Sequence, residues 1–150
     1  LQNIGLNPAD IHQGVIGAGM KIYSSVKNVI NSDDSFLSVR GSKVLLLGMA
    51  YKKNIDDLRE SPSIEILNLL HEKGAEVEYC DPFVNEIPVM RKKSLRLKSI
   101  DLSIEKLNSF DAVLLLTDHD IFDYELILEN CKIIIDTRGR FKSKGKIYRA

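Results

Sequence analysis

The 150-residue sequence has no tryptophan, only two cysteines, and no net charge, because 21 basic residues balance 21 acidic ones. Proteins that bind nucleic acid usually show a basic excess, so this balance argues against that class. The longest apolar runs, such as residues 44–50, are far shorter than the roughly 20 residues that cross a bilayer. We therefore expect neither a nucleic-acid partner nor a membrane partner.

The two cysteines, Cys80 and Cys131, show neither a CxxC motif nor the spacing of a metal site. We interpret them as buried or half-buried thiols in a reducing compartment, and expect no metal. The first residues lack the basic start and apolar stretch of a signal peptide, which favours a cytoplasmic location. Because the chain begins with leucine, we interpret it as a fragment of a longer protein.

Four short segments rich in Val, Leu and Ile predict buried parallel strands. They are residues 43–48, 76–80, 112–117 and 133–136. Between the first two, a helix is predicted with Ser61 as its N-cap, Pro62 at its first position and Gly74 just after its end. Further helices are predicted at 104–109 and 122–130. The alternation predicts an α/β fold, a Rossmann-like parallel sheet with flanking helices, preceded by an N-terminal helix.

The beginning of the chain has a different pattern from the rest. Residues 8–31 predict the N-terminal helix, although its glycines weaken the first half by roughly 1 kcal/mol each. We divide the chain into an N-terminal helical segment with a linker, residues 1–40, and a Rossmann-like domain, residues 41–150. The basic stretch within residues 84–99 is expected to form a solvated loop or an edge strand.

The densest charge in the chain lies in residues 48–63, GMAYKKNIDDLRESPS, directly after the first predicted strand. Nine consecutive positions hold six charged residues, namely Lys52, Lys53, Asp56, Asp57, Arg59 and Glu60. A plain strand-to-helix connection does not need them. Ligands bind at the carboxyl edge of an open α/β sheet, so this run predicts a binding site there.

The same run lacks the GxGxxG turn that lets bare backbone approach the pyrophosphate of a dinucleotide. Only Gly48 is present, and bulky side chains occupy the other positions. An anion at this edge is therefore expected to be held by side chains, those of Lys52, Lys53 or Arg59. Tyr51 either stacks on a base or ribose, or covers the edge of the sheet.

The run at 48–63 resembles the signature of the UDP-glucose/GDP-mannose dehydrogenase family, at the start of its C-terminal, UDP-sugar-binding domain. Three later motifs follow at matching intervals: GAEVEYCDPFV at 74–84, LLLTDHDIFDYELI at 114–127 and IIIDTRGRF at 133–141. The resemblance covers residues 41–141. The tyrosine before Lys52 and the RESP ending are most similar to the bacterial branch that acts on UDP-N-acetylhexosamines.

The resemblance implies roles for individual residues. Tyr51 and Lys52 match family positions that contact the UDP-sugar. Arg138, or alternatively Arg140, matches a late arginine that contacts the nucleotide sugar. Arg59 matches an arginine that reaches the NAD cofactor held by the N-terminal domain. Charge supports these roles, because a diphosphate is bound well by charge-assisted hydrogen bonds from lysine and arginine.

Acidic residues and a histidine near this edge are expected to be structural. The acidic side chains of residues 48–63 would hold the neighbouring cations in place. Asp118 or Asp120 would cap the next helix, with His119 as a polar loop residue. Acid–base catalysis by His119 is the less favoured alternative. Asp81, which precedes a proline, is expected chiefly to form a turn.

Enzymes of this family oxidise the 6-hydroxyl of the sugar to a carboxylate in two NAD-dependent steps, through an adduct on a cysteine. The resemblance implies the UDP-binding part of such an enzyme, acting on a UDP-hexose or UDP-N-acetylhexosamine and supplying uronate precursors of surface polysaccharide. The catalytic cysteine and the NAD loop belong to N-terminal and central domains whose motifs this sequence lacks. Residues 1–40 would be a remnant of the central domain or a connection to it.

No catalytic residue is therefore expected in this chain, and we expect no turnover by the chain alone. Its expected partners are a UDP-sugar, those two domains and, in the full-length enzyme, further copies in a homo-oligomer. One alternative is a stand-alone, non-catalytic nucleotide-sugar-binding module or a truncated paralogue. Another is an unrelated α/β domain, for example a flavodoxin-like one, with no special affinity for uridine nucleotides. We favour the dehydrogenase.

Overall fold

The computed structural model describes residues 19–30, 39–59, 61–88, 96–142 and 145–150. Its main sheet has five parallel strands in the order β2-β1-β5-β6-β7. These strands are β1 (Lys43–Leu47), β2 (Glu76–Cys80), β5 (Ala112–Leu115), β6 (Ile134–Asp136) and β7 (Ile147–Arg149). The helices are α2 (Pro62–Glu72), α3 (Ile104–Ser109) and α4 (Tyr124–Asn130), together with helical residues 19–30, called the N-terminal helix here. The predicted α/β fold is confirmed.

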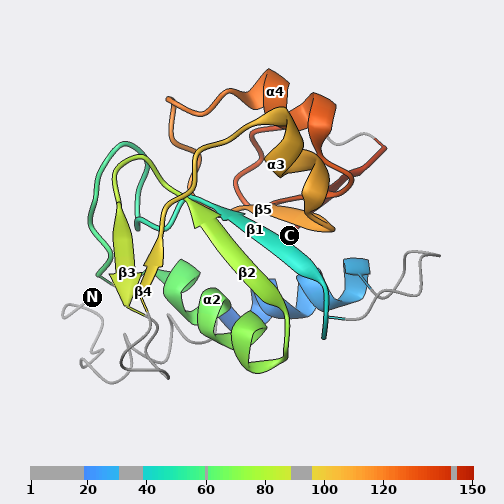
Figure 1. The fold of residues 1–150 in the computed structure, drawn as a ribbon, viewed down its shortest axis with the longest axis horizontal. Coiled ribbons are helices and arrows are strands. Elements are labelled where there is room, and N and C mark those ends of the chain that lie inside the picture. Colours follow the sequence, from blue (N-terminus) through green and yellow to red (C-terminus); the bar gives the residue numbers. More distant parts are fainter. Residues whose placement is uncertain (1–18, 31–38, 60, 89–95, 143–144) are drawn as a thin grey trace, which may run out of the picture.

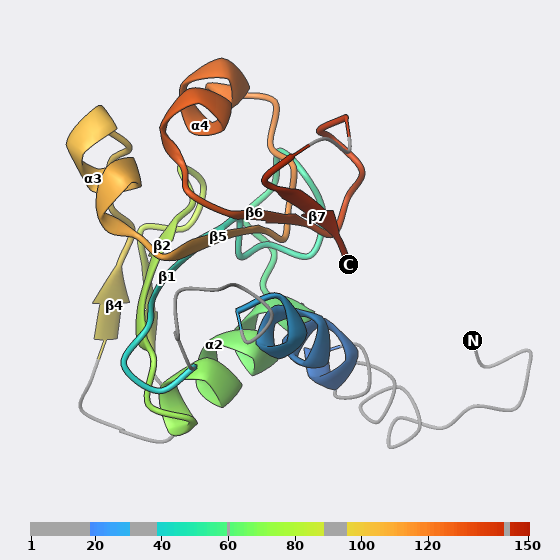
Figure 2. The ribbon, with the colours of Figure 1, turned by 90° about the vertical axis from the view of Figure 1, so that its right-hand side faces the viewer.

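Helices cover both faces of the sheet (Figure 1). The N-terminal helix and α2 lie on one face, while α3 and α4 lie on the other (Figure 2). Alternate residues of β1 pack into the two cores, with Leu46 in the first and Leu45 and Leu47 in the second. All three are fully buried, which explains why the strand is a continuous apolar run rather than an alternating one.

The N-terminal helix packs into the same core as β1 and α2. Tyr23, Val26 and Ile30 are buried there beside Leu46 and Ile66. The first residues of the predicted helix, and the predicted linker at residues 32–35, lie outside the described residues. The division of the chain at residue 40 remains a prediction.

Local signals define the first turn of α2 as the sequence predicted. The Ser61 hydroxyl accepts a hydrogen bond from the N–H of Ser63 at 3.3 Å, and Pro62 is the first helical residue. Gly74 follows the C-cap with a φ of 92°, a conformation that glycine adopts without steric cost.

Three strands were not predicted as such. β7 has one buried residue, Ile147, and is too short for a clear pattern. β3 (Glu86–Pro88) and β4 (Arg96–Lys98) form an antiparallel pair separate from the main sheet, within the region for which a solvated loop or an edge strand was expected. The basic run at residues 91–93 lies outside the described residues.

The strand order reverses between β1 and β5, because the chain runs from β1 to β2 on one side and then crosses to β5 on the other. Such a switch point opens a crevice at the carboxyl ends of the two strands. Gly48 directly follows β1 with a φ of 87°, and a Cβ added there would overlap the carbonyl oxygen of Thr117, just beyond β5. The loops after the two strands therefore touch at their roots, and they meet again further out, where Asn54 bonds to His119 and Asp120.

Candidate functional site

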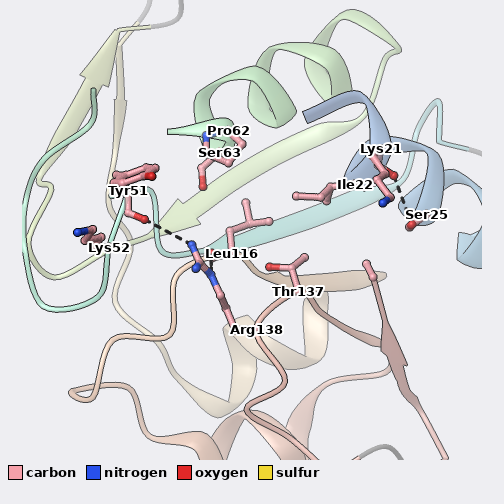
Figure 3. Close-up of a pocket in the computed structure, with 11 residues that line it drawn as sticks. Lys21, Ile22, Ser25, Tyr51, Lys52, Pro62, Ser63, Leu116, Thr137 and Arg138 are labelled. Carbon is pink, nitrogen blue, oxygen red and sulfur yellow. Dashed lines mark hydrogen bonds between the residues drawn. The ribbon is translucent and has the colours of Figure 1, made fainter. Parts of the chain in front are cut away.

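A cavity of about 560 Å³ lies at this carboxyl edge (Figure 3). Its lining residues are Lys21, Ile22, Ser25, Tyr51, Lys52, Pro62, Ser63, Leu116, Thr137, Arg138 and Ala150. The volume falls within the range of small-molecule sites in proteins. The predicted residues Tyr51, Lys52 and Arg138 are thus brought together around one space, although they come from two loops far apart in the sequence.

Arg138 is held in place by its neighbours. Its Nε donates a hydrogen bond to the carbonyl oxygen of Leu116 at 2.7 Å, and one terminal nitrogen lies 3.5 Å from the carbonyl oxygen of Tyr51. Its backbone N–H donates to the buried carboxylate of Asp136 at 2.9 Å. The guanidinium therefore joins the loop after β1 to the segments after β5 and β6.

The loop after β1, residues 48–61, closes on itself. The N–H of Tyr51 donates to the carbonyl oxygen of Asp57 at 2.8 Å, and the Ser61 hydroxyl donates to the carbonyl oxygen of Met49 at 2.7 Å. Its outer part is exposed, and Tyr51 has 43% of its surface in contact with solvent. A rigid frame thus presents an aromatic ring and a lysine at the rim of the cavity.

Two buried side chains fasten this loop to the sheet. The Asp81 carboxylate, after β2, accepts from the N–H groups of Met49 and Ala50 at 2.7 and 3.2 Å. His119, after β5, accepts from the N–H of Asn54 at 2.7 Å through Nδ1, and its Nε2 lies 2.9 Å from the same carboxylate. Asp81 also forms the expected turn, because its other oxygen accepts from the N–H of the residue two positions later.

Two expectations for this segment are wrong. His119 is fully buried rather than a polar loop residue, since its ring bonds to Asp81 and to the loop after β1. The cap of α4 is Asp123, whose carboxylate accepts from the N–H of Leu126. Asp120 instead pairs with Lys53 and Arg140, which belong to neighbouring loops. The partners of His119 and Asp120 are distant in sequence, so a local pattern could not reveal them.

The structure separates the two candidate arginines. Arg138 lines the cavity, whereas Arg140 lies over the ring of Tyr124, with its guanidinium carbon 4.4 Å from the ring centre. Arg140 also contacts the carboxylates of Asp118 at 3.8 Å and Asp120 at 3.3 Å. Asp120 in turn pairs with Lys53 at 3.7 Å. Geometry therefore favours Arg138 as the arginine that faces a ligand.

Arg59 is placed apart from the main cavity. It lines a neighbouring hollow of about 410 Å³ with Ile55 and Asp57, and Tyr51 and Lys52 form the wall that the two spaces share. Two nitrogens of Arg59 donate to the Asp57 carboxylate at 3.0 Å, and these hydrogen bonds lower the pKa of Asp57 to about 2. The expectation that acidic residues of this loop hold its cations is confirmed for this pair.

Sequence analysis missed the part of the cavity that the two helices supply. Lys21 and Ser25 come from the N-terminal helix and lie across the cavity from Tyr51 and Lys52 (Figure 3). Ser63 comes from the first turn of α2. Of these three residues, only Ser63 could have been found from the sequence, because it lies at the start of a helix that follows the first strand. No motif marks Lys21, which reaches this site because its helix packs over the sheet.

The charged side chains that line the cavity have one sign. Among the described residues, its lining side chains include three cations, Lys21, Lys52 and Arg138, and no aspartate or glutamate. The N-terminus of the 11-residue helix α2 also faces it through Pro62 and Ser63, and a helix N-terminus favours an anion. The cavity is therefore cationic in a chain of zero net charge.

The remaining sequence-level candidates do not form a reactive centre. Cys80 and Cys131 are buried as predicted, and burial raises the pKa of each thiol to about 11. In the described part of the chain, no group of three potential metal ligands occurs. Within the same residues, no helix is long and apolar enough to cross a membrane.

Known proteins are similar to this chain in both sequence and fold. A family model for the UDP binding domain of the UDP-glucose/GDP-mannose dehydrogenase family matches residues 45–143. The chain belongs to this family. It is 34% identical over 125 residues to a UDP-N-acetyl-D-mannosamine dehydrogenase of Methanococcus maripaludis, covering 76% of the chain and 26% of that protein. It is also 34% identical over 110 residues to a UDP-glucose 6-dehydrogenase of Rickettsia bellii, covering 70% and 25%.

Among solved structures, the native UDP-N-acetyl-mannosamine dehydrogenase of Staphylococcus aureus superimposes with a TM-score of 0.63 at 27% identity, over 87% of this chain and 30% of that one. The chain therefore spans about a quarter to a third of the length of these members of the UDP-glucose/GDP-mannose dehydrogenase family. Residues 45–143, which the family model matches, carry both loops around the cavity, whereas four of its lining residues, Lys21, Ile22, Ser25 and Ala150, lie outside this range.

Proposed function

We propose that this domain binds the UDP moiety of a nucleotide sugar and forms the substrate-binding part of an NAD-dependent nucleotide-sugar 6-dehydrogenase. The observation that carries the proposal is the cationic cavity, in which Lys52 and Arg138 face one space beside Tyr51. A diphosphate carries about two negative charges, and lysine and arginine bind such groups by charge-assisted hydrogen bonds. The ring of Tyr51, at the rim, would stack on the base or ribose.

The proposal places NAD mainly on another domain. Gly48 corresponds to the first glycine of a dinucleotide turn, but bulky side chains replace the later glycines that let bare backbone approach a pyrophosphate. The described residues thus do not fit a bound NAD at this turn. Arg59, exposed on the far side of the Tyr51–Lys52 wall, is the residue that would reach an NAD held by a neighbouring domain.

In the whole enzyme, the reaction would oxidise the 6-hydroxyl of a UDP-hexose or UDP-N-acetylhexosamine to the uronate, for surface polysaccharide. We infer a cytoplasmic, homo-oligomeric enzyme whose other domains supply the catalytic cysteine and the NAD-binding loop. The support is family membership and the relatives, which are dehydrogenases of UDP-sugars about four times longer than the matched segment. The stand-alone module has no observation in its favour.

The test is calorimetric titration of this chain with UDP, with NAD as the control ligand. Lys52→Ala should weaken UDP binding by about tenfold or more, the value of a lost charge-assisted hydrogen bond. Lys53→Ala is the matched control, because Lys53 pairs with Asp120 and does not line the cavity. It should leave the affinity within about twofold.

Several results would contradict the proposal. They are absence of UDP binding by the wild-type chain, equal UDP affinities of the wild type and the Lys52 variant, or binding of NAD as tight as that of UDP. Loss of affinity in the Lys53 variant as large as in the Lys52 variant would place the anion on the outer face of the loop.

A further inference from the structure

The loop that presents Tyr51 and Lys52 is fastened on both sides of these residues. On one side, the N–H groups of Met49 and Ala50 donate to the carboxylate of Asp81. On the other, the N–H of Asn54 donates to Nδ1 of His119. Asn54 has a φ of 64°, in the left-handed region that asparagine tolerates better than most residues. The conformation between these two fastening points determines where the ring and the lysine lie.

The hydrogen bonds define a single form of the His119 ring. A backbone N–H can only donate, so Nδ1 must accept from Asn54 and carries no proton. The carboxylate of Asp81 accepts, so Nε2 carries the proton and donates to it at 2.9 Å. Both side chains are fully buried, and the ring has no contact with solvent. This burial excludes acid–base catalysis on a substrate in the cavity.

The surroundings hold the ring in this orientation. Its centre lies 4.8 Å from that of Phe83 and 5.5 Å from that of Phe122, and the Tyr124 hydroxyl donates to the backbone oxygen of His119 at 2.6 Å. The charged and titratable groups on the segments around it are Asp81 after β2, Lys53 of the loop, Asp118 and Asp120 on its own segment, Tyr124 of α4 and Arg140 after β6.

We propose that His119 is a positioning residue which, as the Nε2–H tautomer, holds the loop after β1 through the N–H of Asn54 and so sets the geometry of nucleotide binding, while buried Asp81 fixes the tautomer. The loop part follows from the contacts above, and the ligand part rests on the proposed UDP function. A side chain without an acceptor at the place of Nδ1 would leave the N–H of Asn54 without its partner. The loop would then lose one fastening point, and UDP affinity would fall.

The first experiment needs no ligand. Nitrogen chemical shifts of the imidazole, recorded by NMR at mildly alkaline pH, should show a protonated Nε2 and a bare Nδ1 in His119. The amide of Asn54 should exchange slowly with solvent because its N–H donates a hydrogen bond to the fully buried ring of His119. His71, which is partly exposed on α2, provides an internal reference. A proton on Nδ1, or a rapidly exchanging Asn54 amide, would overturn the proposal.

The second experiment uses two variants that each keep half of the ring's hydrogen bonds. In His119→Asn, the amide oxygen takes the place of Nδ1 and still accepts from Asn54. In His119→Gln, the amide nitrogen takes the place of Nε2 and still donates to Asp81. The glutamine variant should bind UDP about three- to tenfold more weakly and exchange the Asn54 amide faster. The asparagine variant should retain affinity within about twofold.

Thermal unfolding separates positioning from general stability, because both variants lose one buried hydrogen bond and should be destabilised alike. Equal losses of UDP affinity in the two variants would show that His119 acts only through stability, and would overturn the proposal.

The two proposals fail in different ways. If the wild-type chain does not bind UDP, the proposed function is wrong, while the tautomer of His119 and the exchange of the Asn54 amide still decide whether the ring fastens the loop. If UDP binds but the glutamine variant matches the wild type in affinity and amide exchange, the function stands and the positioning role is wrong.

Discussion

Two loops at the carboxyl edge each carry one cation into the cavity, and they are held in different ways. The loop after β6 carries Arg138 and is held by Asp136, which accepts from the N–H groups of residues two, three and five positions later. The loop after β1 carries Lys52 and is held by Asp81 and His119, which lie 31 to 65 residues away from their partners on it. One loop is shaped locally, whereas the other depends on the assembled sheet.

This difference indicates which substitutions should disturb each loop. The β6 loop can form its turn as soon as the chain reaches residue 141, because the three hydrogen bonds that Asp136 accepts are local. The β1 loop becomes ordered only when β2 and β5 flank β1, since its two fastening side chains follow those strands. Substitutions of Asp81, which follows β2, should therefore alter ligand binding because they displace the loop after β1.

The largest expected effect comes from Asp81→Asn. Both carboxylate oxygens accept, one from Met49 N–H, Ala50 N–H and the Nε2–H of His119, and the other from Phe83 N–H. The amide group of asparagine would therefore face a donor in either orientation. Loss of one partner from a buried charge-assisted network costs about 3 kcal/mol or more. Urea denaturation should show this decrease in the free energy of unfolding. A change below about 1 kcal/mol would mean that the loop finds other partners easily.

Protonation of the Asp81 carboxylate should account for part of the loss of folding stability at acidic pH. Burial raises the pKa of Asp81, but hydrogen bonds from His119, Met49 and Phe83 outweigh burial and hold this pKa below its ordinary value. The stabilisation is therefore present above the unfolded pKa of about 3.9 and is lost as the pH falls through the folded one. As the pH falls through this window, urea denaturation should show a decreasing difference in the free energy of unfolding between wild type and Asp81→Asn. A difference that stays constant would contradict this assignment.

A smaller effect is expected at the root of the β1 loop, from Gly48→Ala. The added Cβ would meet the Thr117 backbone at a positive φ, and strain and overpacking together cost about 2–4 kcal/mol. Gly41→Ala is the matched control: its φ is 83°, but no atom lies within 4 Å of the added Cβ. The control should lose only the conformational cost, about 1 kcal/mol. Equal losses would show that contact with Thr117 is unimportant.

The two loops were predicted to different extents. The family resemblance implied that Arg138, after the last buried strand, contacts the nucleotide sugar, and the structure shows the local turn at Asp136 that presents it. Four of the five strands of the main sheet and the cap at Ser61 follow from short-range signals in the sequence. The role of His119 could not be predicted, because its partners come together only through the strand order, and Lys21 joins the cavity only through helix packing.

The smallest expected effect, and the sharpest test of the comparison, contrasts the two arginines near the β6 loop. Arg138→Met should weaken UDP binding by about tenfold, because a cation that lines the cavity is lost. Arg140→Met should leave affinity within about twofold, since Arg140 is engaged by Tyr124, Asp118 and Asp120. Both are read by the same calorimetric titration.

Two further measurements make this contrast decisive. Arg138→Lys keeps the charge but loses the planar fork that bonds Leu116, so its affinity should fall between those of wild type and Arg138→Met. Arg140→Met should cost less than about 1 kcal/mol of stability, as expected for a partly exposed ion pair. If Arg140→Met lost as much affinity as Arg138→Met, the loop would have to rearrange around the nucleotide. The turn at Asp136 would then be the more adaptable of the two loops. The loop after β1, which is held by residues distant in sequence, would be the more rigid one.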